Sequence, residues 1–460
     1  MERDQHTAGS GRRSGGRRQT RRRYLAGAAI AGTGALAAAC GGAAGSATSQ
    51  PKLVKGPVQI TWTFWATPEN IAFFNETVSA FQTAFPEVKV QGTQIPGVYE
   101  DAIFTLVSGG TPPDAMETTR PTATGWAVKG ISTALDPYLS RGGFKEGDYY
   151  PTAVSPWKVN GKLYALPREV DNWTLWYNKK LFAEAGIKPP DESWTWDTLV
   201  ANGQRLTKRE GGLTQAAFAP GGFNNKLFVA LGLQNGTKLQ DRETLPTKLL
   251  MDQPAFADAM QWMADLMNKQ HIAPTQDEIK QGGNSQMLFS SGKLAMWFGE
   301  ASAAARYAPA IKDFDYDVAA PLKGKQMGTW LGGACHTISR DGKQKEAAAQ
   351  YLLFMAGPEG IKLLAKYAFG VPAVKSVANS DLFLKQPGPP ANKAAWLKAF
   401  DYGSGPPMTP VWTDVEAALN AELAQTWTGA RSAKDSIAAA WPKVQTLMTQ
   451  AQEMVKQMPQ

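Results

Sequence analysis

Residues 161–187 read GKLYALPREVDNWTLWYNKKLFAEAGI, and this stretch decides the fold that the sequence predicts. It follows an Asn160-Gly161 pair, which favours a tight turn because both residue types tolerate positive φ angles. Residues 163–166 form a short apolar run, typical of a buried strand. Pro167 is expected to end that strand, because proline cannot donate to a sheet ladder.

The second half of the stretch changes character twice. Residues 168–172 are polar, and residues 173–178 are a run of β-favouring, mostly aromatic side chains. Residues 179–186 have a helical pattern that ends in glycine, the usual residue after a helix C-terminus. The order therefore predicts a strand, a polar crossing, a second strand and a helix, with Asp171 and Asn172 at the crossing.

The same alternation extends to both sides of this stretch. Strands are predicted at residues 58–64, 88–90 and 315–321, and helices at residues 69–85, 102–108, 194–208, 256–269 and 410–458. In one of these helices Met260, Met263 and Met267 recur at helical spacing, which is typical of a core-facing stripe. Strands that alternate with helices in this way predict α/β lobes.

The totals set limits on the kind of protein. A chain of 460 residues is too long for one compact core, so two domains are expected. Fifteen tryptophans favour either dense packing of large residues or an aromatic-lined pocket. The formal charge of +8 comes mostly from residues 1–39, which hold eight arginines and two acids. The remaining chain is nearly balanced, so its charge gives no support for nucleic-acid binding.

The N-terminal region is predicted to be an export signal. Residues 20–26, TRRRYLA, resemble the twin-arginine export pattern, and the apolar run at residues 25–39 is too short for a permanent membrane span. Small residues precede Cys40, as in the processing site of a lipoprotein, with ordinary secretion as the alternative. We therefore expect residues 1–39 to be a signal peptide, Cys40 to carry lipid, and residues 40–57 to be a flexible tether.

Several segments together resemble the family 1 extracellular solute-binding proteins, the sugar-binding components of ABC importers. The segments that carry the resemblance are GKLYALP and LWYNKKLF in the central stretch, SGGTPPDAM at residues 108–116, GWAVKGISTALDPYL at residues 125–139, the TWD segment at residues 195–197, and MLFSSGKLAMW at residues 287–297. They span nearly the whole chain after the leader. The resemblance is specific for the family and says little about the ligand.

The resemblance implies an α/β, two-lobed periplasmic-binding-protein-like fold (type II), with discontinuous lobes joined by a hinge of crossover segments. The implied N-terminal lobe holds residues 54–169 and 323–370, the C-terminal lobe holds residues 171–322 and 371–460, and the crossings lie near residues 169–172, 320–326 and 369–373. It further implies a carbohydrate ligand, ABC permease subunits as partners, no cofactor, a monomer, and a position at the outer face of the cytoplasmic membrane.

Motifs of catalysis and metal binding are missing from the sequence. It contains no HExxH, no paired CxxC, no EF-hand loop, no G-x-S-x-G elbow and no Walker A motif. A dedicated metal site and ATP hydrolysis are therefore not expected. A glycosidase needs two carboxylates flanking a bond, and forty acids leave such a pair open without singling one out.

Cys335 and His336 are neighbours in an expected strand. Successive side chains of a strand point to opposite faces, which argues against a Cys/His catalytic dyad. A buried, inert Cys335 is favoured over a reactive thiol. The sequence thus predicts a binding protein, with an exported carbohydrate-active enzyme, or a binder of a polyol or glycerol phosphodiester, as the alternatives.

Candidate ligand contacts follow from chemistry and position. Sugar sites combine aromatic rings, which cover apolar faces, with planar polar groups that pair with hydroxyls, and they lie at the carboxyl ends of strands. These criteria nominate Trp65, Thr67, Glu117, Thr118, Arg120, Asp171, Asn172, Trp173, Phe223, Asn224, Asn225, Trp297, Gly299, Glu300, Trp330, Gly332, Gly333 and Trp412.

Some of these candidates have a strong structural alternative. The apolar runs around Trp173 and Trp297 favour the core over the pocket. Trp330 lies in a glycine-flanked polar segment, where stacking on a ligand is the more natural role. The family resemblance places Asp171 where maltodextrin-binding proteins use an acidic ligand contact.

Overall fold

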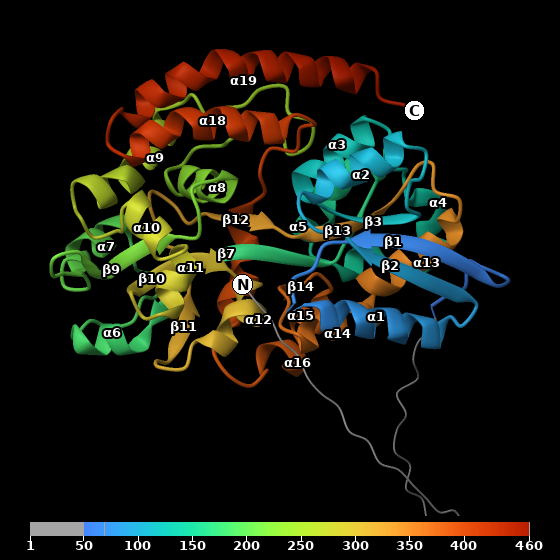
Figure 1. Cartoon of the computed structure of the whole chain (residues 1–460), viewed down its shortest axis with the longest axis horizontal. Coiled ribbons are helices and arrows are strands. Elements are labelled where there is room, and N and C mark those ends of the chain that lie inside the picture. The colour runs from blue at the N-terminus through green and yellow to red at the C-terminus, as the bar shows by residue number, and fades with distance from the viewer. Residues whose placement is uncertain (1–49, 69, 460) are drawn as a thin grey trace, which may run out of the picture. The chain divides into compact units, whose positions relative to one another are not determined.

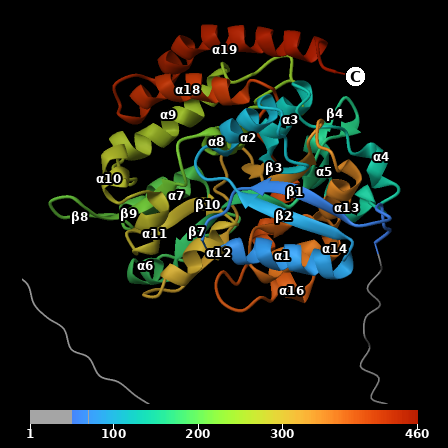
Figure 2. The same ribbon diagram turned by 45° about the vertical axis from the view of Figure 1, so that its right-hand side comes forward.

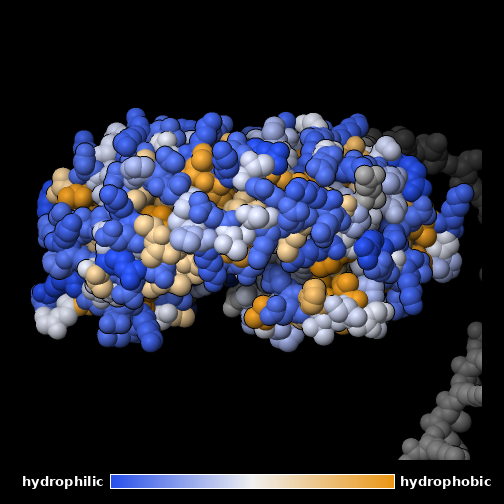
Figure 3. Space-filling view, turned by 90° about the horizontal axis from the view of Figure 1, so that it is seen from above, coloured by the Kyte–Doolittle hydropathy of each residue, from blue (hydrophilic) through white to orange (hydrophobic). Residues whose placement is uncertain are grey.

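The structure is a computed structural model that describes residues 50–68 and 70–459. The predicted signal peptide, Cys40 and most of the expected tether lie outside the described residues. Among the residues that are described, no helix is long and apolar enough to cross a membrane. Hydrophilic side chains cover most of the face seen in Figure 3, where hydrophobic residues form small scattered groups.

The first lobe is built on a five-stranded sheet with the order β2-β1-β3-β13-β6. Its strands are β1 (Val58–Phe64), β2 (Val88–Gln94), β3 (Ala115–Thr119), β6 (Leu166–Pro167) and β13 (Ala334–Ile338). β1 pairs in parallel with β2 and β3, whereas β13 runs antiparallel to β3 and β6. The predicted strands at 58–64 and 88–90 are thus confirmed.

The second lobe is built on an eight-stranded sheet whose main path is β15-β12-β7-β10-β9-β8, with β11 and β14 also pairing with β7. Its strands are β7 (Glu169–Asn178), β8 (Lys208–Arg209), β9 (Leu213–Pro220), β10 (Leu294–Glu300), β11 (Tyr316–Ala319), β12 (Thr329–Gly332), β14 (Val371–Pro372) and β15 (Gly403–Ser404). A separate hairpin joins β4 (Lys158–Val159) to β5 (Lys162–Leu163).

β7 corrects the predicted polar crossing. It is one continuous strand of ten residues, all of them buried, and Asp171 and Asn172 lie inside it rather than in a link between two strands. Their backbones pair with Gly332 and Leu331 of β12. Polarity misled the prediction because this strand is covered on both faces and its polar side chains bond within the protein. The chain changes sheet at Arg168, immediately before β7.

Pro167 ends a strand, as predicted, since it is the last residue of β6. It pairs with Cys335 from β6, which is the edge strand of its sheet. An edge position tolerates proline because one side of the backbone needs no ladder partner. The predicted run at 163–166 is correspondingly split, with β5 ending at Leu163 and β6 beginning at Leu166.

The second passage between the lobes comes later than expected. Residues from 323 onward were assigned to the first lobe, but β12 still pairs with β7 in the second sheet. β13 then begins the run that pairs with β3 in the first sheet. The passage therefore lies at Gly333, whose φ of +127° suits glycine. β14, at the predicted third crossing near 369–373, pairs with the first residues of β7. Residues 375–384 were assigned to the second lobe, but α15 (Lys375–Ala378) and α16 (Asp381–Leu384) pack on α14 (Pro358–Lys366) of the first lobe, so the third passage is completed only after them.

Helices cover both faces of the first sheet. Figures 1 and 2 show α2 and α3 on one side of β1 and β3, with α1 and α14 on the other. The helices and 3-10 turns of this part are α1 (Ile71–Ala84), α2 (Tyr99–Ser108), α3 (Arg120–Val128), α4 (Asp136–Leu139), η1 (Glu146–Asp148), α5 (Pro151–Val154), η2 (Ser155–Trp157), α13 (Lys345–Ala356), α14 (Pro358–Lys366), α15 (Lys375–Ala378) and α16 (Asp381–Leu384).

The helices of the second part pack around the second sheet. They are α6 (Lys179–Glu184), α7 (Trp196–Gly203), α8 (Asn225–Gln234), α9 (Pro254–Asn268), α10 (Gln276–Gln281), α11 (Ser285–Ser290), α12 (Ala303–Tyr307), η3 (Ala308–Ala310), α17 (Ala394–Lys398), η4 (Ala399–Asp401), α18 (Trp412–Trp427) and α19 (Ala433–Lys456). α6 is capped at its start by Asn178, whose side chain accepts from the backbone N–H of Leu181, and Gly186 after it has φ of +63°. Met260, Met263 and Met267 of α9 are buried, as predicted.

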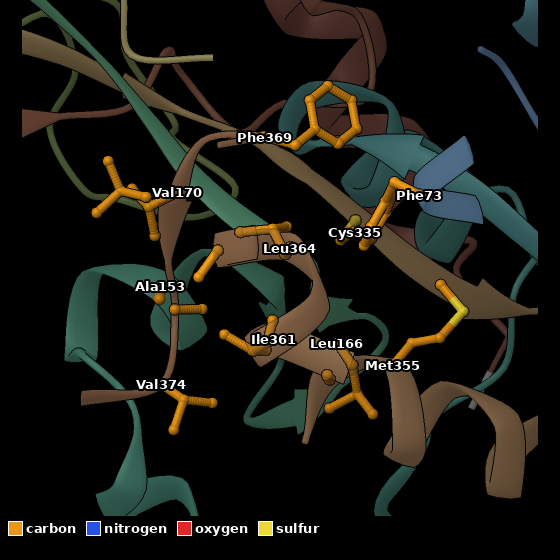
Figure 4. Close-up of a cluster of buried hydrophobic side chains, with 14 of the residues drawn as sticks. Phe73, Ala153, Leu166, Val170, Cys335, Met355, Ile361, Leu364, Phe369 and Val374 are labelled. Atoms are coloured by element: carbon orange, nitrogen blue, oxygen red, sulfur yellow. The ribbon is translucent and has the colours of Figure 1, made fainter. Parts of the chain in front are cut away.

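The core of the first lobe gathers segments that are far apart in the sequence. Figure 4 shows Phe73 of α1, Leu166 of β6, Cys335 of β13 and Leu364 of α14 in one cluster of buried side chains. The Cys335 thiol is fully buried and its Sγ–H donates to the carbonyl of Thr118 at 3.5 Å. Burial raises the pKa of this thiol well above its usual value, which fits the inert role that was favoured.

The C-terminal helix α19 contacts both lobes. Most of its length packs on α18 and α9 of the second lobe. At its end Met454 and Val455 pack against a small cluster that contains Ala127, Val128 and Tyr164 of the first lobe. The two lobes are therefore joined by α19 as well as by the three chain passages.

Candidate functional site

A cleft of about 530 Å³ lies where the two sheets meet. β3, β7 and β12 all end or begin at this place, so side chains at the ends of strands from both lobes face one space. The cleft has the size of a site for a small molecule. Ten of the eighteen predicted contacts line it: Trp65, Thr67, Arg120, Asp171, Asn225, Glu300, Trp330, Gly332, Gly333 and Trp412.

Three other predicted residues lie in strands but face away from the cleft. Glu117 is fully buried and its carboxylate accepts from the backbone N–H of Trp65 at 3.0 Å. Thr118, also buried, faces β13. Asn172 is fully buried and its Nδ2 donates to the carbonyl of Trp396 at 2.9 Å. The alternation of a strand explains why Asn172 turns away while its neighbour Asp171 faces the cleft.

The remaining five are structural. Trp173 and Trp297 are core residues, as their apolar neighbours suggested. A Cβ on Gly299 would lie 2.3 Å from the Trp297 ring, so this glycine makes room for that indole. Phe223 packs on Trp427. Asn224 is the N-cap of α8, where its side chain accepts from the backbone N–H of Lys226.

A buried ion cluster forms the base of the cleft at the first passage. Arg168 donates to the carboxylates of Glu117 and Glu169, and all three side chains are at most 5% exposed. Its guanidinium also lies 4.5 Å from the centre of the Phe369 ring and 5.7 Å from that of Trp65. Burial raises the pKa of Glu169, and the charge of Arg168 opposes that rise. The cluster positions Trp65 through the bond that its backbone donates to Glu117.

Asp171 is held by α12 and the segment before it. One oxygen accepts from the hydroxyl of Ser302 at 2.5 Å, and the other accepts from the backbone N–H of Ser302 at 3.2 Å and of Asn172 at 2.9 Å. The carboxylate therefore has a fixed orientation at the cleft wall. Oδ1 uses both of its lone pairs in this way, whereas Oδ2 has one left that can accept from a ligand hydroxyl.

Trp330 is placed by a glycine and covered by a lysine. A Cβ on Gly332 would lie 1.9 Å from Cζ2 of Trp330, so the indole lies across this glycine. The Nζ of Lys226 stands 4.8 Å from the ring centre. The ring is 7% exposed. Stacking of a ligand on Trp330, as the sequence suggested, therefore requires Lys226 to move off the ring.

Lys226 and Arg306 share one carboxylate. Both donate to Glu300, Lys226 to Oε1 and Arg306 to Oε2, the latter at 3.1 Å. Burial lowers the pKa of Lys226, while the charges of Asp171 and Glu416 act in the opposite direction. This arrangement fixes a positive group next to an aromatic face and three carboxylates.

Helices α3, α8 and α18 complete the lining. Arg120, the first residue of α3, is 3% exposed, and its Nη2 donates to the carbonyl of Thr152 at 2.6 Å. Asn225, the first residue of α8, donates from its backbone and from Nδ2 to the carboxylate of Glu416 in α18. Trp412 opens α18, one helical turn before Glu416.

The sequence reasoning missed several lining residues. They are Asn70, Val98, Glu100, Asp101, Thr119, Pro121, Thr122, Arg168, Glu169, Lys226, Ser302, Arg306, Ala334, Phe369, Pro406, Thr413 and Glu416. Helical spacing could have found Glu416, since it lies four residues after the predicted Trp412 on the same face. Lys226 directly follows the predicted Asn224 and Asn225. Nothing local marks Ser302 or Phe369, which reach the cleft only through tertiary packing.

The cleft offers hydrogen-bonding and stacking groups rather than a metal site. Within residues 50–68 and 70–459, no group of three or more His, Cys, Asp or Glu side chains is placed to hold a metal ion. His336, next to Cys335, is fully buried among Trp62 and other core residues, away from the cleft lining.

Comparison with known proteins agrees with this arrangement. Residues 65–362 match the family model of the bacterial extracellular solute-binding proteins. The diacetylchitobiose binding protein of Streptomyces coelicolor is 26% identical over 420 residues, which cover 86% of this chain and 91% of that protein. The sn-glycerol-3-phosphate-binding periplasmic protein of Pectobacterium atrosepticum is 22% identical over 355 residues, covering 73% of this chain and 78% of the relative.

A solved structure shows the same fold. An ABC substrate-binding protein from Listeria monocytogenes, in complex with cycloalternan, superimposes with a TM-score of 0.78. It is 23% identical and the match covers 85% of this chain and 99% of that one. The two-lobed architecture predicted from the central stretch is thereby confirmed. Since the family model matches well over half of the sequence, this chain belongs to the bacterial extracellular solute-binding protein family.

Proposed function

We propose that this protein captures a carbohydrate outside the cytoplasmic membrane and delivers it to the permease of an ABC importer. The observation that carries the proposal is the cleft between the lobes, which combines Trp65, Trp330 and Trp412 with oriented carboxylate, amide and guanidinium groups. Sugars present both apolar faces and hydroxyls, and this mixture of groups matches both. Relatives named for sugar binding support the same ligand class.

The ten predicted residues that line the cleft are proposed to contact the ligand, together with Lys226, Ser302 and Glu416. Asp171 would accept from ligand hydroxyls. Trp65 is half-buried, packs against Tyr99 and has the Arg168 guanidinium 5.7 Å from its ring centre; it is more exposed than Trp330. Closure of the lobes around the ligand would supply part of the binding free energy.

Binding without turnover is also part of the proposal. A glycosidase needs one carboxyl group free to donate a proton and a second free to attack or activate water. In this cleft Glu169 is held by Arg168, Glu300 by Lys226 and Arg306, and Asp171 by Ser302. These three of the six lining carboxylates are therefore not free for that chemistry, which favours recognition over catalysis at their positions.

The first experiment is a thermal-shift screen of the purified protein against a sugar library. A sugar at a hundred times its dissociation constant should stabilise the protein by about 2.7 kcal/mol. Isothermal titration and recovery of the sugar unaltered would follow for each positive sugar. A sugar that is consumed would show an enzyme, and a library without any stabilising sugar would contradict carbohydrate capture.

Membrane attachment through Cys40 and a monomeric state are further parts of the proposal. Cys40 follows small residues and an apolar run, which supports lipidation. A Cys40→Ala variant should then be released from the membrane or remain unprocessed. A variant that stays membrane-bound with a normally trimmed N-terminus would contradict the anchor. The mass of the detergent-free, Cys40→Ala protein by light scattering tests the monomer.

A further inference from the structure

The charges that line the cleft are unevenly matched. Six carboxylates and four cationic side chains line it. A charge in a partly buried cleft is weakly screened, so an excess of one sign affects which ligands can enter. The effect of this excess on a ligand depends on which of the charges already have a partner within the protein.

Three of the four cations are already paired. Arg168 lies between Glu117 and Glu169, and Lys226 and Arg306 share Glu300. Only Arg120 makes no ion pair within the described residues. Its guanidinium is buried, donates to a backbone carbonyl, and lies 5.6 Å from the centre of the Trp157 ring. A ligand anion would therefore meet one unpaired cation, and that cation is 3% exposed.

Four of the six carboxylates have no cationic partner among the described side chains. Asp171 and Glu416 are held by neutral donors, the hydroxyl and backbone of Ser302 and the amide groups of Asn225. Glu100 and Asp101, at the start of α2, lie on the opposite wall of the cleft, and Asp101 is exposed. Both walls of the cleft thus present carboxylates that have no ion-pair partner, although the charge of Lys226 acts on Asp171 and Glu416.

An ammonium group already occupies one wall. Nζ of Lys226 stands over the face of Trp330 at 4.8 Å and donates to Glu300; burial lowers its pKa to about 8, and the charges of Asp171 and Glu416 oppose that fall. Proteins use aromatic faces to recognise ammonium ligands, because the ring attracts a cation. The position of Lys226 shows that the Trp330 face and the carboxylates around it hold a cationic group at this wall.

We propose that the cleft selects its ligand by charge: it accepts neutral saccharides or saccharides that bear an ammonium group, and rejects saccharides or polyols that bear a carboxylate or phosphate. This inference rests on the proposed function and narrows its ligand class. The physical reason is that Asp171, Glu416, Glu100 and Asp101 repel an anion, whereas neutral hydroxyls can donate to the same carboxylates. The glycerol phosphodiester alternative is thereby disfavoured.

The test compares probes of the three charge classes. The purified protein is titrated calorimetrically with neutral malto- and xylo-oligosaccharides, with chitosan oligosaccharides, with oligogalacturonides and with glycerol 3-phosphate, at pH 7 and low salt. The expected result is binding within the first two classes and at least tenfold weaker or no binding in the last two. For a chitosan oligosaccharide that binds, affinity should fall as NaCl is raised, because salt screens the exposed Asp101, whereas the buried Asp171 is screened much less.

Two outcomes overturn the inference and can be told apart. An oligogalacturonide or glycerol 3-phosphate that binds as tightly as the best neutral or ammonium probe refutes charge selection but leaves solute binding intact. A protein that binds none of the probes, nor any neutral sugar of the library, refutes the proposed function and the inference with it.

A matched pair of variants locates the charge that matters. Glu416→Gln removes from the cleft a carboxylate that has no ion-pair partner. Glu422→Gln removes a carboxylate from the same helix but outside the cleft, where Glu422 pairs with Arg431 on the surface. Both change the net charge equally. Glu416→Gln should reduce the ratio of neutral to anionic affinity severalfold, and Glu422→Gln should leave it unchanged. Equal ratios in both variants, or in Asp171→Asn as well, would overturn the assignment.

Discussion

Replacing Arg168 by methionine tests the ion cluster at the base of the cleft. The side chains of Arg168, Glu117 and Glu169 are 3%, 0% and 5% exposed, so the change leaves two carboxylates buried beside each other without a cation. Breaking a buried pair in this way costs about 3–5 kcal/mol of unfolding free energy. Trp65 should also lose its fixed position, because its backbone N–H donates to Glu117.

The measurement is urea unfolding at pH 7, followed by tryptophan fluorescence, for Arg168→Met beside a surface control. Lys366→Met breaks the surface ion pair between Lys366 and Glu76, whose side chains are 55% and 35% exposed. This change should lower the free energy of unfolding by less than about 1 kcal/mol. Lowering the pH should narrow the gap between Arg168→Met and the parent protein, because protonation relieves a buried carboxylate such as Glu169. The reasoning would be refuted if Arg168→Met lowered the free energy of unfolding by no more than the control variant does.

Three further outcomes are expected. His336 is fully buried and its pKa lies well below the usual value, so that, as the pH falls, this imidazole is protonated in the unfolded chain before it is protonated in the folded protein. The free energy of unfolding should therefore fall by about 1.4 kcal/mol per pH unit below about pH 6.5. Urea unfolding of His336→Leu should lack that pH dependence. Gly333→Ala should destabilise by about 1–3 kcal/mol in the same assay, since a Cβ there would lie 2.3 Å from the carbonyl oxygen of Glu169 at a φ that favours glycine. In a Cys40→Ser background, Cys335 should resist a thiol reagent in the native protein and react fully in urea; rapid native labelling would contradict its burial.

Local sequence patterns were sufficient for the elements and the family but not for the borders between lobes. Apolar alternation located β1 and the helical face of α9, because these residues bury one side against a neighbour. The crossing was misplaced because polarity was taken as a sign of exposure. Asp171 and Asn172 are buried in β7, where they bond to Ser302 and Trp396, and these partners lie far away in the sequence.

The same limit applies to the cleft. Trp65 and Trp330 were predicted to line the cleft from their positions at strand ends, and both do, since strand ends from both sheets meet there. The neighbours of each tryptophan separated Trp330 from Trp297: the apolar run around Trp297 favoured the core, and the glycine-flanked segment around Trp330 favoured the cleft, as the structure has them. What the sequence did not show is that each indole lies across the glycine two residues after it. Residues such as Ser302 become visible only when the chain is folded.

The end of α19 offers a place for a probe that reports movement of the lobes. Its body belongs to the second lobe, while Met454 and Val455 rest on the first lobe beside Tyr164. Any rotation of one lobe against the other must therefore shear this small apolar joint. A fluorescent domain fused after the last turn of α19 would lie at the contact between the lobes, so its fluorescence should change when a ligand in the cleft moves one lobe against the other. The same domain inserted in the loop before α10 would be attached to the second lobe alone, and its fluorescence should not change.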